Sequence, residues 1–205
     1  MKKFSFLPLI LCASVVLGLG FGCAGRSPAT NYYVLDSEQK PVENAPSPKM
    51  AVQIRPVNIP NYLDRNSIVT RSPNTVQVTL ADYHQWAESL GSGMRRVLAE
   101  VLAPRLALQN VSLEPADDHS NGPLQLFVQV LRFDGTFGAD AILEVRWTLR
   151  TVNDKIAAQG NFMEHQPAGL SYESLVKAQS ALLVRLGESL VNPLAHASLK
   201  HAQKN

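Results

Sequence analysis

The sequence is poor in cysteine and has almost no excess of charge of either sign. Two cysteines occur among 205 residues, and both lie within the first 23. A disulfide-rich scaffold needs many more, so that class is excluded. Nineteen basic residues oppose 17 acidic ones, for a formal net charge of +2. This balance argues against nucleic acid as a partner, because neutralising phosphates needs a large excess of lysine and arginine.

Motifs for catalysis and metal binding are also missing. None of the five histidines has a second metal ligand at zinc spacing, and HExxH does not occur. The run Gly169-Leu170-Ser171-Tyr172-Glu173 comes closest to the nucleophile pattern G-x-S-x-G, but Glu173 replaces the second glycine. Ser171 is better explained as a helix cap. The sequence therefore predicts no catalytic residue, no metal site and no cofactor.

The first 22 residues have the pattern of a lipoprotein signal peptide. Lys2 and Lys3 precede the uncharged run 4–22, which ends in small residues directly before Cys23. This order is typical of secretory signals. The run 19–23, Leu-Gly-Phe-Gly-Cys, is similar to a bacterial lipobox, which ends at a lipid-modified cysteine. A transmembrane anchor and an ordinary cleaved signal are the alternatives, although a proline and three glycines weaken a spanning helix.

Cleavage before Cys23 defines the expected mature chain. It removes two of the 19 basic residues, which leaves 17 against 17 acidic ones, and it removes Cys12. We expect acyl chains on Cys23, so that no thiol is left for a disulfide or for catalysis, and residues 23–31 then form a short tether. Lipoproteins that stay at the inner membrane tend to have aspartate after the cysteine. Ala24 therefore favours the outer membrane, with the domain facing the periplasm.

Residues 32–195 are predicted to form one α+β domain. Period-two alternation and β-branched or aromatic runs predict strands. These strands lie at 32–35, 50–55, 67–71, 75–80, 111–113, 124–133, 142–152 and 156–164. Helical spacing predicts one helix over 82–102, ended by Pro104, and another from Ser171 to Asn192-Pro193. We expect two layers, with both helices on the apolar face of one largely antiparallel sheet, and a disordered tail at 196–205.

The segment 57–71 is the main candidate for a functional surface. It places apolar, aromatic and arginine side chains beside prolines, between two predicted strands. Two interpretations stay open: a packed loop that covers the core, or an interaction loop, since aromatic and arginine side chains often anchor interfaces. Trp86 is likewise either core or interface. The interface candidates are Tyr62, Leu63, Asp64, Arg65, Arg71 and Trp86.

Three runs resemble the ABC-type transport auxiliary lipoprotein family, which includes PqiC-like lipoproteins. They are Ile59-Pro-x-Tyr-Leu-Asp-Arg-x-x-Ile-Val-Thr-Arg71, Trp86-Ala87-Glu88-x-Leu90, and Arg95-x-Val97-Leu98-Ala99-x-x-Leu102. The resemblance implies an outer-membrane lipoprotein without catalytic residues. It implies two partners, an inner-membrane protein and a tunnel-forming MCE protein, in a system that moves lipid between membranes, and a ring-like homo-oligomer. A stand-alone envelope assembly or stability lipoprotein is the second hypothesis, and a periplasmic hydrolase is the third.

Overall fold

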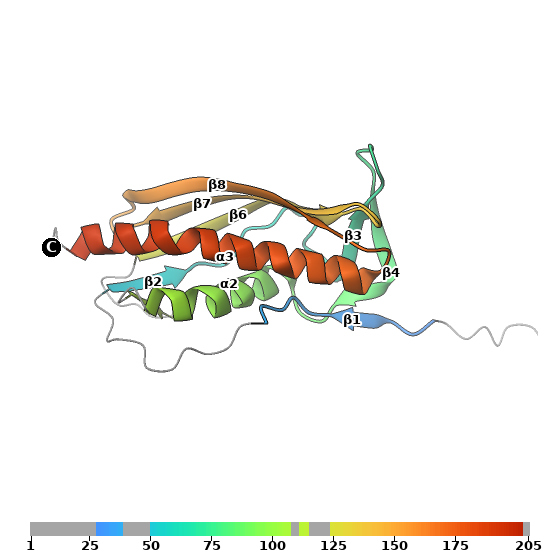
Figure 1. Cartoon of the computed structure of the whole chain (residues 1–205), viewed down its shortest axis with the longest axis horizontal. Coiled ribbons are helices and arrows are strands. Elements are labelled where there is room, and N and C mark those ends of the chain that lie inside the picture. The colour runs from blue at the N-terminus through green and yellow to red at the C-terminus, as the bar shows by residue number, and fades with distance from the viewer. Residues whose placement is uncertain (1–27, 39–49, 108–110, 115–123, 203–205) are drawn as a thin grey trace, which may run out of the picture.

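A computed structural model describes residues 28–38, 50–107, 111–114 and 124–202. This part of the chain forms two sheets and two helices (Figure 1). The larger sheet has the strand order β5 (Val111–Glu114), β2 (Met50–Ile54), β6 (Leu124–Gly135), β7 (Asp140–Arg150) and β8 (Ile156–Pro167). The smaller sheet has the order β1 (Asn31–Tyr33), β4 (Val78–Trp86) and β3 (Ser67–Arg71). The helices are α2 (Leu90–Ala107) and α3 (Tyr172–Ala202). The predicted signal peptide 1–22 and Cys23 lie outside the described residues.

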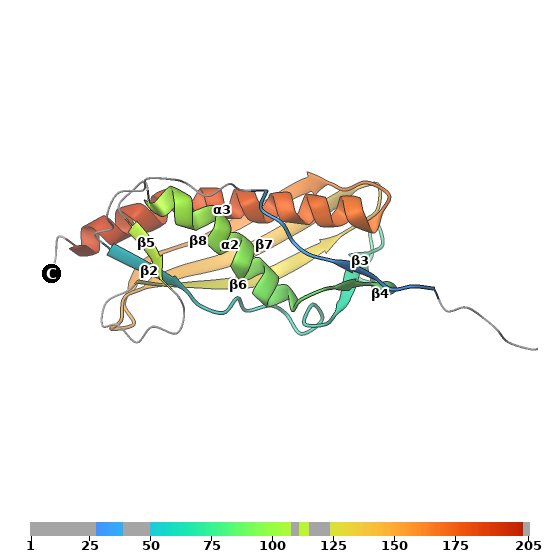
Figure 2. The ribbon, with the colours of Figure 1, turned by 90° about the horizontal axis from the view of Figure 1, so that it is seen from below.

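The α+β class is confirmed, and both helices lie on one face of the larger sheet (Figures 1 and 2). The strands divide into two sheets, where one was expected. The longest ladders, β6–β7 and β7–β8, are antiparallel as predicted, whereas β2 pairs in parallel with both β5 and β6, as β1 does with β4. Parallel neighbours need a long crossover, and the segment that contains α2 supplies the one between β2 and β5.

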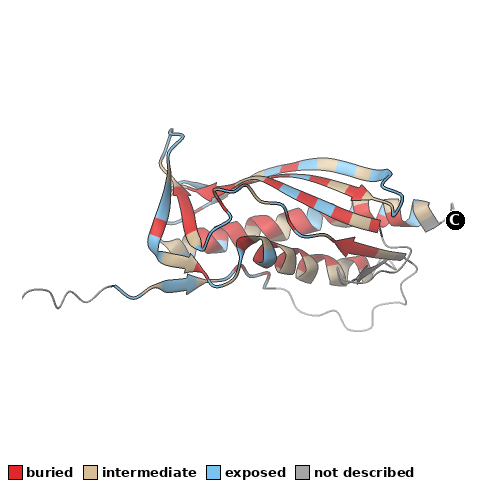
Figure 3. Cartoon of the chain, turned by 180° about the vertical axis from the view of Figure 1, so that it is seen from behind, coloured by how far each residue is buried: buried red, intermediate tan, exposed pale blue. Residues whose placement is uncertain are grey.

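The antiparallel meander of β6, β7 and β8 is confirmed. Along β6, Leu126, Val128 and Val130 are buried, and the residues between them are more exposed; β7 shows the same alternation (Figure 3). Period two places one set of side chains under the helices and the other set on the open face. The core therefore lies between this sheet and the two helices.

The helix predicted over 82–102 is wrong in its first part. Residues 78–86 form β4, which pairs with β3 on one side and β1 on the other. The helix α2 begins only at Leu90, after Ser89, whose Oγ accepts a hydrogen bond from the amide of Ser92 at 3.4 Å. The backbone hydrogen bonds of β4 to β1 and β3 outweigh the helical spacing of its apolar side chains. Gly91 and Gly93 consequently lie in the first turn of α2.

Two prolines that were expected to end helices lie inside them. Pro104 lies in α2, which continues to Ala107, and Pro193 lies in α3, which continues to Ala202. An interior proline disfavours a helix by about 3 kcal/mol. Buried side chains beyond each proline offset this cost, Leu106 in α2 and Leu194 and Ser198 in α3. Residues 196–202 of the expected disordered tail are therefore helical.

Candidate functional site

The predicted interaction segment, residues 57–71, is a turn followed by strand β3. The amides of Leu63 and Asp64 donate to the carbonyl of Pro60 at 2.8 and 3.2 Å. The Leu63 side chain is only 1% exposed, whereas Asp64 and Arg65 are exposed. One side of the segment therefore covers the core, and the other presents an acidic and a basic side chain to solvent.

Arg71, at the end of β3, joins the two sheets through a buried carboxylate on β6. Its Nε and Nη2 donate to Oδ2 of Asp134 at 3.0 and 2.8 Å, and Nε of Arg132 donates to Oδ1 at 2.9 Å. The Asp134 side chain has no exposed surface. Hydrogen bonding to Asp134 raises the pKa of Arg71 above its ordinary value. Since a buried carboxylate without partners is strongly unfavourable, the geometry gives Arg71 a structural role.

Tyr62 lies beside this ion pair and is partly buried. Burial raises the pKa of its phenol above 10.0, and the negative charge of Asp134 adds to the increase. Arg71 and Arg132 act in the opposite direction. The structure therefore brings two predicted interface candidates, Tyr62 and Arg71, to the junction of the two sheets.

Trp86, the last residue of β4, lies in the core of the subunit. Its amide donates to the carbonyl of Asn66 at 2.7 Å, which ties β4 to the residue just before β3. Tyr33 of β1 is its register partner on the other side. With 6% of its surface exposed, the side chain has little area left for a partner protein.

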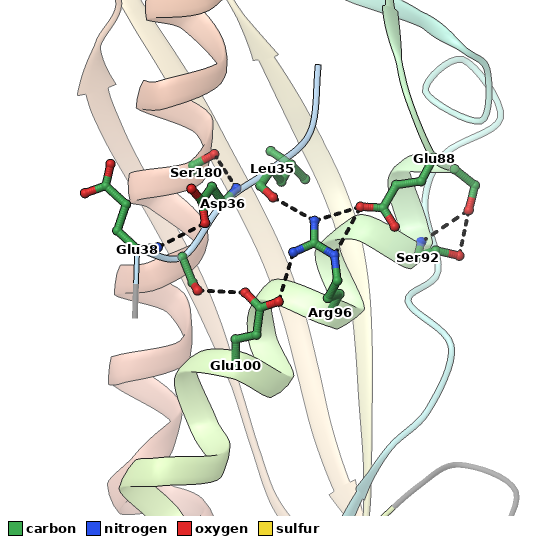
Figure 4. Close-up of polar contacts among 10 residues, drawn as sticks. Leu35, Asp36, Glu38, Glu88, Ser92, Arg96, Glu100 and Ser180 are labelled. Carbon is green, nitrogen blue, oxygen red and sulfur yellow. Dashed lines mark hydrogen bonds and ion pairs between the residues drawn. The ribbon is translucent and has the colours of Figure 1, made fainter. Parts of the chain in front are cut away.

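The N-terminal strap, residues 31–38, is held across α2 by a cluster that the sequence analysis did not find. Arg96 of α2 donates to the carbonyl of Leu35 at 2.7 Å, to Oε1 of Glu88 at 2.7 Å and to Oε1 of Glu100 at 2.9 Å (Figure 4). Hydrogen bonding to Glu88 is the main cause of the raised pKa of Arg96. The acidic residue of the Trp-Ala-Glu motif thus positions the arginine that binds the strap.

Further contacts join the strap to β4 and to α3. The Tyr33 hydroxyl and Nδ1 of His84 are hydrogen-bonded at 2.8 Å, and the His84 ring stacks on Tyr172 with centroids 3.8 Å apart. The amide of Asp36 donates to Oγ of Ser180 at 3.1 Å (Figure 4). No local pattern predicts these contacts, because Tyr33 and His84 are 51 residues apart in the chain.

An open groove of about 820 Å³ lies between the strap and α3. Its walls mix apolar and charged side chains, including those of Tyr32, Val34, Glu38, Val176, Lys177 and Ala181. Nζ of Lys177 lies 2.7 Å from Oε1 of Glu173. Within the described part of the chain, no group of three His, Cys, Asp or Glu side chains is arranged to hold a metal ion. In that same part, no helix combines the length and apolar character needed to cross a membrane.

These contacts define a class of protein: an α+β domain with an N-terminal strap fixed to β4 and to both helices. The sequence profile of the family described as "ABC-type transport auxiliary lipoprotein component" matches residues 33–191. The chain therefore belongs to this family, as its motifs predicted. A comparison with curated protein sequences gives no match.

Solved structures share the fold at low sequence identity. A crystal structure of an uncharacterized protein is 19% identical, with a TM-score of 0.67 over 80% of this chain and 98% of that chain. Protein XCC0632 from Xanthomonas campestris, a DUF330 protein, is 14% identical, with a TM-score of 0.69 over 85% and 99%. The PelC dodecamer of Paraburkholderia phytofirmans is also 14% identical over 74% and 91%, but its TM-score of 0.41 is too low to support conclusions about assembly.

Proposed function

We propose that this chain is an outer-membrane lipoprotein that acts as the non-catalytic docking component of an MCE-type intermembrane lipid transport system. Family membership carries the proposal, because the family is described as a lipoprotein component that is auxiliary to ABC-type transport. Acyl chains on Cys23 anchor the protein at the periplasmic face. Its partners are an MCE tunnel protein and an inner-membrane protein of the same system, and copies of the chain form a ring-like homo-oligomer.

The N-terminal strap supports the anchoring role. Only residues 24–30 separate Cys23 from β1. Arg96 and Ser180 bind the strap backbone at Leu35 and Asp36. The short distance along the chain between Cys23 and the fixed strap therefore keeps the domain close to the membrane that holds the anchor. Two or more acyl chains are needed for stable attachment, since one chain binds a bilayer only marginally.

The exposed part of the motif segment is the proposed contact with the tunnel protein. Asp64 and Arg65 are exposed at the turn, and a groove of about 500 Å³ beside them is lined by Asp64 and by Arg95 of α2. Leu63 and Trp86 are buried and contribute through the fold. Opposite charges at the rim of an interface influence the rate and the specificity of association more than its strength.

The anchor is tested by comparing two cysteine variants in whole cells. Cys23→Ala is expected to leave the protein soluble after export and to prevent its isolation from membranes together with the MCE protein. Cys12→Ala is the matched control, because Cys12 lies in the segment that cleavage removes. Full envelope function of the soluble Cys23→Ala form would contradict anchoring. An acylated protein that never co-purifies with an MCE protein would instead support the stand-alone envelope lipoprotein.

The docking surface is tested with a double variant, Asp64→Ala with Arg65→Ala. We expect co-purification with the MCE protein to fall while the urea unfolding curve stays unchanged. Glu173→Ala with Lys177→Ala is the control, because it also removes one acidic and one basic side chain, each 71% exposed. Exposed pairs of this kind contribute about 0–1 kcal/mol to stability. Equal co-purification of both double variants would show that the tunnel protein binds elsewhere.

A further inference from the structure

The two most exposed large apolar side chains of the described residues lie on separate loops at the same end of the molecule. Val76, in the turn between β3 and β4, is 95% exposed, and Leu170, between β8 and α3, is 85% exposed. The β3–β4 turn and the β8–α3 loop lie at the end opposite the C-terminus (Figures 1 and 2). The loop between β6 and β7 lies at this end too, because the amide of Gly138 in it donates to the carbonyl of Gly169 in the β8–α3 loop at 3.1 Å. Single exposed apolar side chains are normal on a protein surface, so the feature that calls for an explanation is that the two most exposed ones lie at the same end.

The sequence segments around Val76 and Leu170 contain no charged side chains. Residues 72–81 and 166–172 contain no aspartate, glutamate, lysine or arginine. At the other end of the molecule, the turn between β7 and β8 contains Asp154 and Lys155. Moving a charged side chain out of water costs far more free energy than moving an uncharged loop that exposes a valine or a leucine. Among the described residues, the first end is therefore the better suited to contact with an apolar phase, although the half-exposed Asp140 follows its β6–β7 loop.

The strap brings this same end close to the proposed anchor. The chain enters β1 at Asn31, and the described part of the N-terminus leaves the molecule at the end that carries the β3–β4 turn (Figures 1 and 3). Eight residue steps from Cys23 to Asn31 span at most about 28 Å. Tyr33 is hydrogen-bonded to His84 and Arg96 binds the carbonyl of Leu35, so this end of the domain stays within reach of the anchor.

We propose that the end of the domain formed by the β3–β4 turn and the β8–α3 loop rests on the lipid bilayer, with Val76 and Leu170 inserted at the boundary between headgroups and acyl chains. The inference rests on the proposed acylation of Cys23 and goes beyond it. The acyl chains on Cys23 then tether the domain to the bilayer, and the β3–β4 turn and the β8–α3 loop set the orientation of the domain on it. Side chains of other elements, among them Asp64 and Arg65, are left free for protein partners.

The test attaches the anchor chemically, so that its result does not depend on acylation in the cell. The mature chain, residues 23–205, is purified without lipid, and the Cys23 thiol is coupled to a maleimide lipid in vesicles of phosphatidylethanolamine and phosphatidylglycerol. Val76→Trp and Leu170→Trp report on the two loops, and bromine on the acyl chains quenches only inserted tryptophan. Trp86 and Trp147 are buried and give a constant background. Ile156→Trp, at a site 55% exposed where β8 begins, is the control.

We expect brominated lipid to reduce the added emission at positions 76 and 170 about twofold, and to leave position 156 unchanged, because only the first two reach the headgroup boundary. Quenching no stronger at 76 and 170 than at 156 overturns the inference. A concentration-dependent blue shift at 76 and 170 without vesicles also overturns it, since it would identify this end as a contact between copies of the chain. Mass spectrometry of the cellular protein tests acylation separately. An unmodified Cys23 there would remove the anchor without altering the vesicle result.

Discussion

Replacement of Arg71 by methionine is expected to destabilise the domain by about 2–3 kcal/mol. Removal of one partner of a buried ion pair typically costs about 3–5 kcal/mol. The cost is lower here because Arg132 still donates to Oδ1 of Asp134 and because the Arg71 side chain is 22% exposed, so water can reach the vacated position. Methionine retains most of the apolar stem of arginine, so that the change removes mainly the charge and its two hydrogen bonds.

Urea unfolding at neutral pH measures this loss. With a slope of about 2 kcal/mol per molar, the midpoint should fall by about 1 M. The double variant Arg71→Met with Asp134→Leu should recover much of the stability, because the penalty comes from the buried carboxylate and not from the lost attraction. Lysine at position 71 should give an intermediate value, since it keeps the charge but not the two parallel hydrogen bonds. A double variant as unstable as Arg71→Met would refute this reasoning.

Three further predictions follow from the same geometry. Trp86→Ala should cost about 3–5 kcal/mol in thermal or urea unfolding if its role is packing; a small loss accompanied by failure to assemble would instead mark an interface. Burial raises the pKa of Tyr62, so the contribution of this residue to the free energy of unfolding is present below about pH 10 and is lost as the pH rises further. Tyr62→Phe should therefore make the decline of stability above pH 10 less steep in denaturant titrations. Arg96→Ala should accelerate hydrogen exchange at the amide of Asp36 and change global stability by less than about 1 kcal/mol, because its ion pairs are partly exposed; Lys177→Ala should leave that exchange rate unchanged.

The sequence predicts elements well where hydrogen-bond partners are near in the chain. Alternation along 124–164 gives the meander, since each strand pairs with the next one. Ser171 is confirmed as the cap of α3: its Oγ accepts a hydrogen bond from the amide of Ser174 at 3.1 Å. Both features depend on residues within a few positions of each other or on the adjacent strand.

Prediction fails where distant partners decide. The last residues of β4 have helical spacing, but β1, far earlier in the chain, offers ladder bonds to residues 84–86 that no local window contains. Pro104 and Pro193 mark helix ends by propensity, yet packing of Leu106 and Leu194 continues both helices. The contacts of the strap could not be predicted for the same reason: Arg96 and Leu35 are far apart in the chain, and no local sequence pattern indicates that they meet.

Several of the motif residues act inside the subunit, whereas Asp64 and Arg65 of the same motif are exposed. Leu63 and Trp86 are buried, Arg71 neutralises Asp134, and Glu88 positions Arg96. A variant at any of these positions that loses its partner protein would lose it together with part of the fold, and so would not locate a docking surface. Only exposed residues whose removal leaves unfolding unchanged can do that. The anchor, the membrane-facing loops and the docking turn are therefore best probed at Cys23, at Val76 with Leu170, and at Asp64 with Arg65, because each set can fail without the others.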